Sequence, residues 1–318
     1  MPKKGPTSDI DWLTKHLSPL MDAGRDILTR SRFLPAKPPP TYDKGYWTGL
    51  KLVLEKYYIP PYLNILAPRT RVGYVDLFAG PGLNQIGDQK VPVPGSPLVP
   101  VAVKDPLKKH PFSAFIFSET EKDYANALAM RVKLFPEMSA VSQIMTQDAN
   151  KVVEELPDIL KKRDIGHCLV FIDPEGLEFK WKSLKSLVSH TDCDLIINFP
   201  SSGIQRNLQN PETRNTVQAF LGPGSENIPL GADDEWAIQL YRKNLAGIGK
   251  DVSTEITIKS GGPFHYHLIP AVKTTYRNSP WFKNIFPPAK QIIERLSGDV
   301  LGIIADQIEG KQQRLLPG

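Results

Sequence analysis

Short apolar segments alternate with helix-like segments through the middle of the chain, and this alternation restricts the fold more than any other feature. Five apolar runs of strand length lie between residues 72 and 199, and each of the first four precedes a segment with helical spacing of its apolar residues. The runs cover residues 72–78, 114–117, 142–146, 168–172 and 195–199. Near-continuous apolar strands separated by helices are typical of a parallel sheet covered on both faces. The sequence therefore predicts a doubly wound, Rossmann-like α/β sheet.

The segments before and inside the first unit predict additions to this sheet. Residues 1–45 are expected to form an N-terminal extension, with a helix over 9–28 and a proline-rich linker over 34–40. An amphipathic helix is predicted from 46 to 58, where Pro60 and Pro61 are expected to end or kink it. Residues 83–95 are polar and punctuated by glycine and proline, which predicts a loop. A helix is expected to begin at Ser96 as its cap, with Pro97 at its first position.

The second half of the chain changes character. Helices over 212–221 and 233–245 are predicted to form a helical insertion at about 203–250. The segments 252–258 and 264–272 predict an antiparallel hairpin at the end of the sheet, joined through a turn at 260–263. A C-terminal helical segment is expected over 276–318, with one helix through 292–303. The ligand-binding domain is thus predicted to span residues 46–275.

Composition and charge restrict the location and the partners. The formal net charge is +5, but basic and acidic residues are interleaved. A nucleic acid is therefore one candidate partner, and a mixed solvated surface explains the charge equally well. Cys168 and Cys193 lie in or beside apolar runs, which favours buried thiols in a reducing compartment, and no metal-ligand spacing is evident. With no secretory signal and no apolar run of spanning length, the prediction is a cytoplasmic protein outside the membrane.

Acidic residues follow four of the predicted strands, at the edge where a doubly wound sheet binds its ligand. Asp76 lies at the end of the first strand, Glu119 follows the second, Asp148 the third and Asp173 the fourth. A carboxylate at Glu119 can accept hydrogen bonds from both hydroxyls of a ribose. Asp148 can accept from an adenine amino group or cap the following helix. This set suits a ligand with ribose hydroxyls, an adenine amine and an ammonium but no phosphate, and S-adenosylmethionine fits that description.

The turn after the first strand supports a ligand of this kind. Gly80 and Gly82 allow the backbone to approach a ligand closely. Their spacing matches neither the dinucleotide fingerprint nor the phosphate loop, which argues against a dinucleotide-dependent oxidoreductase.

Several motifs together resemble the three-Cys-motif partner protein family, which has a class I methyltransferase-like fold. The likeness covers roughly residues 45–275. It rests on residues 74–82 (Tyr-Val-Asp-Leu-Phe-Ala-Gly-Pro-Gly), 95–98 (Gly-Ser-Pro-Leu), 117–119 (Phe-Ser-Glu), 171–174 (Phe-Ile-Asp-Pro) and the helix 51–58. The family's name records pairing with a separate cysteine-motif protein, so the resemblance implies such a partner.

The resemblance also implies roles for individual residues. Asp76, Phe78, Gly80 and Gly82 would line the methionine end of the cofactor, while Glu119 would hold the ribose and Asp148 the adenine. Asp173, followed by Pro174, lies where many amino-methyltransferases place the residue that accepts from the target amine.

The motif after the fourth strand restricts the kinds of methyl transfer that the chain could catalyse. Base amino-methylation commonly uses Asp/Asn-Pro-Pro and an aromatic ring, whereas Pro174 is followed here by Glu175 and Gly176. Carbon-5 methylation of cytosine needs a cysteine after the proline, and that residue is absent here. Two hypotheses therefore stand: a methyltransferase acting on a nucleic acid or a partner-presented substrate, and a non-catalytic accessory module of the same fold.

Two histidines near the end of the sheet form a separate pattern. His265 and His267 alternate along a predicted strand and face the same side. Strand alternation alone explains them as polar-face residues, because a metal site would need a third ligand that the sequence pattern does not supply. Ser201, Ser202 and Arg206, after the fifth strand, are candidates for substrate contact.

Overall fold

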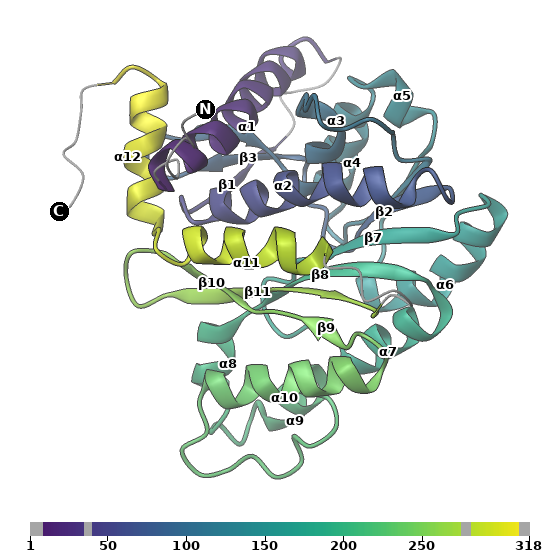
Figure 1. The fold of residues 1–318 in the computed structure, drawn as a ribbon, viewed down its shortest axis with the longest axis vertical. Helices are drawn as coiled ribbons and strands as arrows, with labels where there is room; N and C mark the ends of the chain where they lie inside the picture. The colour runs from purple at the N-terminus through teal and green to yellow at the C-terminus, as the bar shows by residue number, and fades with distance from the viewer. Residues whose placement is uncertain (1–8, 35–39, 275–280, 312–318) are drawn as a thin grey trace, which may run out of the picture.

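A single mixed sheet forms the centre of the computed structural model, which describes residues 9–34, 40–274 and 281–311 (Figure 1). The strand order is β10-β11-β8-β7-β2-β5-β6, and the short strand β9 pairs with β11. The strands are β2 (Val72–Asp76), β5 (Ala114–Ser118), β6 (Ser142–Met145), β7 (His167–Ile172), β8 (Cys193–Phe199), β9 (Val252–Ser253), β10 (Ile256–Lys259) and β11 (His265–Val272).

The five predicted core strands are parallel, and the order reverses around β2. The chain runs from β2 outward to β5 and β6, then returns to the other side of β2 to form β7 and β8. Beyond β8, β11 runs antiparallel, and β10 pairs antiparallel with it. The predicted doubly wound sheet with a terminal antiparallel hairpin is therefore confirmed.

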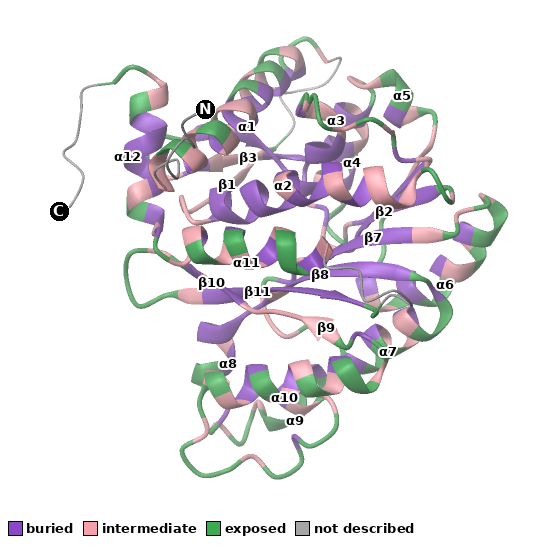
Figure 2. Ribbon diagram, viewed as in Figure 1, coloured by how far each residue is buried: buried purple, intermediate pink, exposed green. Residues whose placement is uncertain are grey.

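Helices cover both faces of this sheet. Alternate residues of each strand point to opposite sides, and both sets are apolar, so both faces have to be buried. Along β7, Leu169 and Phe171 enter one apolar cluster, while Val170 and Ile172 enter the other. The first face is covered by α1 (Asp9–Ser31), α2 (Thr48–Leu66), α3 (Val99–Ala102), α4 (Lys122–Val132), α5 (Pro136–Ser139), α11 (Trp281–Ile293) and α12 (Gly298–Ile308). The second is covered by α6 (Ala149–Lys162), α7 (Trp181–His190), α8 (Ser201–Asn207), α9 (Arg214–Leu221) and α10 (Asp234–Gly247). Figure 2 shows the buried residues concentrated in the sheet and on the inner sides of these helices.

The segment predicted as a loop over 83–95 is instead a buried hairpin, so that prediction was wrong. Strands β3 (Leu83–Ile86) and β4 (Val91–Pro94) pair antiparallel, and β1 (Tyr42–Lys44) adds to β3 to give a second, three-stranded sheet. Helix α1 packs on β4 so closely that a Cβ at Gly24 would overlap the Pro92 carbonyl. This long-range contact buries the hairpin, and the polar local sequence of residues 83–95 gives no indication of it.

Helix α2 continues through Pro60 and Pro61 to Leu66, so the prolines do not end the helix, and the alternative prediction of a kink stays a prediction. Each proline removes one helical hydrogen bond and crowds the carbonyl four residues earlier. Most of α2 is buried against the sheet and α11, and this tertiary packing offsets the local cost.

Other boundaries differ in detail. The helix at Ser96 is a 3-10 turn, η1 (Ser96–Leu98), with Gly95 rather than Ser96 at the cap position. The single terminal helix expected through 292–303 is two helices, because Ser297 caps α12 by accepting from the Val300 amide at 3.5 Å. Helix α8, directly after β8, was not predicted.

The division of the chain into three parts stays a prediction. Residues 35–39 of the expected linker and 275–280, around the second boundary, lie outside the described residues. Helices α8 to α10 fill the span between β8 and β9, and the predicted N-terminal helix is present as α1. Within the described ranges, no helix combines the length and the apolar character needed to cross a membrane.

Candidate functional site

A cavity of about 390 Å³ opens at the carboxyl ends of β2 and β5, where the strand order reverses. This is the position at which open α/β sheets bind ligands. Side chains from β1 and α2 form one wall, and the turns after β2, β5, β6 and β7 form most of the rest. Asn84 of β3, the Gly95-Ser96 segment and Tyr124 of α4 complete the lining. Of the predicted site residues, the cavity is lined by Phe78, Gly80, Glu119, Asp148 and Asp173.

The two glycines after β2 have different roles. Both have positive φ angles, +59° at Gly80 and +79° at Gly82, which glycine adopts without steric cost. A Cβ at Gly80 would meet nothing within 4 Å and would project into open space. A Cβ at Gly82 would lie 2.9 Å from Leu128 of α4, so Gly82 is required for packing beneath the turn. The buried Arg131 fixes this turn from below by donating to the Pro81 carbonyl at 2.5 Å.

Glu119 connects the β5 turn to the glycine turn. Its carboxylate accepts from the Gly80 amide at 2.8 Å and from the Glu121 amide at 2.8 Å. A carboxylate has about four lone-pair positions, so both oxygens retain acceptor capacity toward the cavity. The contact with the ribose stays a prediction, but the side chain is held in a fixed orientation beside the turn.

Asp148 is a helix cap in this structure. Its side chain accepts from the Asn150 amide at 2.9 Å at the start of α6, which is one of its two predicted roles. Because Asp148 also lines the cavity, the cap positions a carboxylate there. Its contact with an adenine stays a prediction.

Asp76 lies under the cavity floor and is completely buried. Its Oδ1 atom accepts from the Phe78 amide at 3.0 Å, and no hydrogen bond within the described residues reaches its Oδ2 atom. Burial raises the pKa of Asp76 to about 7. Glu55 of α2 is also completely buried, and burial raises its pKa well above its ordinary value, although the Tyr74 hydroxyl donates to it at 2.7 Å. Two buried carboxyl groups with raised pKa values, Asp76 and Glu55, therefore lie close enough for the charge of Asp76 to raise the pKa of Glu55 further.

Asp173, the predicted acceptor of a target amine, has both carboxylate oxygens engaged. The Asn198 side chain at the end of β8 donates to Oδ1 at 2.7 Å. Lys51 of α2 forms an ion pair with Oδ2. Pro174 does not line the cavity, but it begins the turn that carries Glu175 to the rim.

Residues of β1 and α2 that the sequence did not single out complete the cavity. Lys44 forms an ion pair with Glu175 at 2.9 Å, and the Tyr42 hydroxyl donates to the same carboxylate. Tyr42 packs edge-to-face on Tyr124, with ring centroids 5.2 Å apart, so two aromatic rings stand on one wall. Burial, followed by the nearby Lys51 charge, lowers the pKa of Lys44 to about 8.

A sequence signal for Lys51 exists, although it is weak. Helix α2 is apolar on nearly every side, yet it carries Lys51 and Glu55 one turn apart. Charged residues inside an otherwise buried helix are expected to have partners. Lys44 and Tyr42 had no such signal, because they reach the cavity only through the unpredicted pairing of β1 with β3.

Comparisons with known proteins give similarity of shape. No family model and no curated protein sequence matches the chain. Among solved structures, protein LPL1258 from Legionella pneumophila aligns with a TM-score of 0.47 and 13% identity, over 79% of this chain and 91% of that one. A putative O-methyltransferase from Klebsiella pneumoniae aligns with a TM-score of 0.37 and 12% identity, over 85% and 92%. Magnesium protoporphyrin IX methyltransferase from Synechocystis, solved with bound S-adenosylmethionine, gives 0.35 and 10%, over 85% and 100%.

Similarity at these levels assigns neither a ligand nor an activity. One feature distinguishes this sheet from the nucleotide-binding sheet of dehydrogenases. Strand β11 runs antiparallel beside β8, whereas the dehydrogenase sheet continues in parallel. The observed fold is a doubly wound, mostly parallel α/β sheet with an antiparallel strand beside β8, as expected from the sequence. Membership of the three-Cys-motif partner family stays a hypothesis.

Proposed function

We propose that the cavity binds S-adenosylmethionine and that the protein is a methyltransferase. The main support for this proposal is the excess of negative charge in the cavity. Six carboxylate side chains line it, those of Glu119, Glu121, Asp148, Asp173, Glu175 and Glu178, against two lysines, Lys44 and Lys51. Both lysines are already paired with carboxylates of the cavity. A site with this excess of negative charge favours a ligand with a sulfonium and an ammonium, and disfavours one with a pyrophosphate.

The proposed binding mode follows the sequence-based roles, with one change. Glu119 accepts from the ribose hydroxyls, Asp148 accepts from the adenine amine, and Phe78 and Gly80 line the methionine end. Asp76 and Gly82 act indirectly, since they hold the turn from below rather than contact the ligand. S-adenosylmethionine supplies the reactive methyl group when it is bound.

Methyl transfer requires the acceptor atom to approach the methyl group in line, and the protein contributes mainly by positioning the two. Asp173 is proposed to accept from the acceptor amine, with Asn198 fixing its orientation through Oδ1. The Lys51 ammonium pairs with Oδ2, so the acceptor has to share or replace that contact. The proposed acceptor is a nucleic acid or a group presented by a partner protein.

An accessory module that binds the cofactor without using it is the second candidate. The full engagement of Asp173 by Asn198 and Lys51 favours it, because no oxygen of this carboxylate lacks a partner within the chain. In that case the protein works in complex with a separate cysteine-motif protein.

Transfer of a labelled methyl group separates the two candidates. Purified protein is incubated with methyl-labelled S-adenosylmethionine and with fractionated DNA, RNA and protein from a bacterial lysate. The methyltransferase proposal predicts label in one fraction and a loss of about 100-fold or more in Asp173→Asn, while the double variant Lys51→Met/Asp173→Asn controls for the unpaired lysine. Cofactor binding without label in any fraction would instead support the accessory module.

A further inference from the structure

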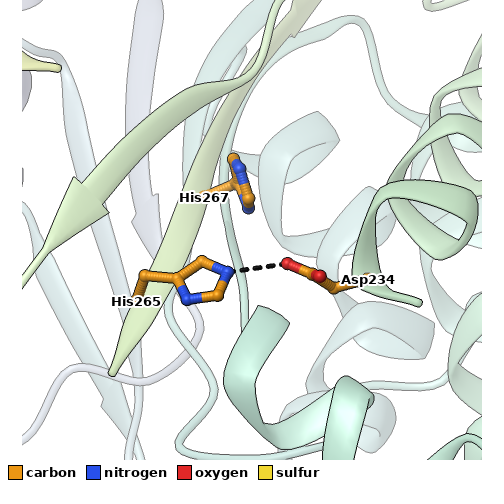
Figure 3. A group of neighbouring side chains, drawn as sticks. All are labelled: Asp234, His265 and His267. Carbon is orange, nitrogen blue, oxygen red and sulfur yellow. Dashed lines mark hydrogen bonds and ion pairs between the residues drawn. The ribbon is translucent and has the colours of Figure 1, made fainter. Parts of the chain in front are cut away.

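Asp234, His265 and His267 converge on one point outside the cavity (Figure 3). One ligand atom from each residue lies within 4.8 Å of the others. The two histidines alone lacked a third ligand in the sequence, and Asp234, 31 residues before His265, supplies it. Its carboxylate lies 2.7 Å from Nε2 of His265.

The backbone fixes the direction of all three side chains. His265 and His267 are two residues apart on β11 and therefore project from the same face of the sheet. Asp234 is the first residue of α10, whose cap is the preceding Asp233, which accepts from the Trp236 amide at 3.0 Å. Because Asp233 caps the helix, the carboxylate of Asp234 is available to face the histidines.

Two serines at the start of α8 hold the two histidines, Ser201 through the imidazole of His267 and Ser202 through the backbone of His265. The Ser201 hydroxyl lies 2.5 Å from Nδ1 of His267 and 3.4 Å from the Phe199 carbonyl. Toward a carbonyl the hydroxyl can only donate, so its oxygen accepts from Nδ1–H of His267 and leaves the lone pair on Nε2. Ser202 holds the His265 backbone by accepting from its amide at 2.9 Å and donating to its carbonyl at 2.8 Å. A hydrogen bond to the ring nitrogen, like that between Ser201 and His267, sets the tautomer and orientation of a metal-binding histidine.

We propose that Asp234, His265 and His267 bind a divalent first-row transition metal ion. Zn²⁺ is the ion whose geometry we compare with the site and the ion used in the test. Two imidazoles and one carboxylate suit such an ion, whereas Mg²⁺ and Ca²⁺ prefer sites made of oxygen ligands alone. Ligand atoms about 2.0 Å from a tetrahedral zinc are roughly 3.3 Å apart. The Asp234–His265 contact at 2.7 Å has to open slightly and the wider separations have to close, which side-chain rotation achieves.

Exposure and location support a site that can receive both an ion and a further ligand. His267 is buried, while the His265 and Asp234 side chains are 26% and 17% exposed, so the cluster is closed on one side and open on the other. Three protein ligands leave one tetrahedral position for water or substrate. His267 pairs with Phe199, which follows the Asn198 that holds Asp173, so the cluster lies on the same edge of the sheet as the cavity.

A Ser-His-Asp hydrolase arrangement of Ser202, His265 and Asp234 explains the geometry less well. Ser202 lies 3.4 Å from Nδ1 of His265, but its hydroxyl donates to the His265 carbonyl at the shorter distance of 2.8 Å. The serine is also buried, so a substrate carbonyl has poor access to its oxygen.

Metal binding is tested directly on the full chain with any affinity tag removed. After treatment with a chelator and its removal, Zn²⁺ is titrated calorimetrically, and Co²⁺ is followed by its visible absorption. The proposal predicts one ion per chain with micromolar or tighter affinity, and a Co²⁺ spectrum of four-coordinate type. The matched variants are Asp234→Asn, which keeps the shape of the side chain, and His190→Ala, which removes an exposed histidine of α7.

The variants decide whether this cluster holds the ion. Asp234→Asn and His265→Ala are expected to weaken Zn²⁺ binding by about 100-fold, and Ser201→Ala by roughly 10-fold, while His190→Ala has no effect. Thermal unfolding without metal confirms that each variant is folded. Absence of binding to the wild-type chain, or binding that Asp234→Asn leaves unchanged, would overturn the proposal. The assay needs no cofactor, so its outcome is independent of the proposed methyltransferase function.

Discussion

Lys51 on α2 and Asp173 at the end of β7 form an ion pair at the edge of the cavity, although 122 residues separate them. Their side chains are 9% and 17% exposed. Removing one partner of a mostly buried pair leaves the other charge uncompensated. Lys51→Met is therefore expected to lower the free energy of unfolding by about 3 kcal/mol at neutral pH, as measured by urea denaturation. Lys51→Met/Asp173→Asn should recover most of this loss, and a single variant as stable as the wild type would show that the pair is unimportant.

The two glycines of the turn should respond differently to alanine. Gly80→Ala meets only the conformational cost of a positive φ, about 1 kcal/mol, because the added methyl group projects into open space. Gly82→Ala adds an overlap with Leu128 to that cost and is expected to destabilise by about 2–4 kcal/mol. Thermal or denaturant unfolding of both variants gives the comparison. Equal losses would mean that the turn relaxes away from α4.

Asp76 should make stability depend on pH in a defined direction. Its pKa rises from 3.8 to about 7 on folding, so between these values the folded state binds more protons than the unfolded state. The free energy of unfolding therefore falls as pH rises from about 4 to about 7, by roughly 4 kcal/mol at most for this group. Asp76→Asn keeps the shape and removes the titration. The stability of the wild type minus that of Asp76→Asn should fall over this interval and then level off, and a difference independent of pH contradicts the assignment.

The sequence predicted those elements whose burial is visible locally. The strand Cys193–Phe199 and its neighbours are apolar on both faces, which only a covered sheet explains. The antiparallel hairpin was predictable because Ile256 and Ile258 alternate with polar residues before a glycine-rich turn. Elements stabilised by distant partners were missed. Strands β3 and β4 depend on α1, and α2 passes through two prolines because its surroundings bury it.

The residues of the candidate site also fall into two groups, those that the sequence predicted and those that only the folded chain shows. Glu119, Asp148 and Asp173 follow strands, so the topology alone predicts that they meet at one edge. Lys51 and Lys44 arrive from segments outside the strand–helix units, and only the folded chain shows that they neutralise part of the acidic cavity. Asp234 is comparable, since nothing between it and His265 in the sequence indicates that α10 begins beside β11.

Titration of S-adenosylmethionine into the purified chain, followed by calorimetry, measures directly whether the cavity binds this cofactor. We expect micromolar binding, about −8 kcal/mol, and weaker binding of NAD. Glu119→Gln keeps one acceptor oxygen but loses the charge, and it should weaken binding by about 10-fold or more. Glu154→Gln, on the exposed side of α6, is the matched control and should bind like the wild type. No heat from S-adenosylmethionine with folded protein, or equal binding by Glu119→Gln, would contradict the assignment of this cavity as the cofactor site.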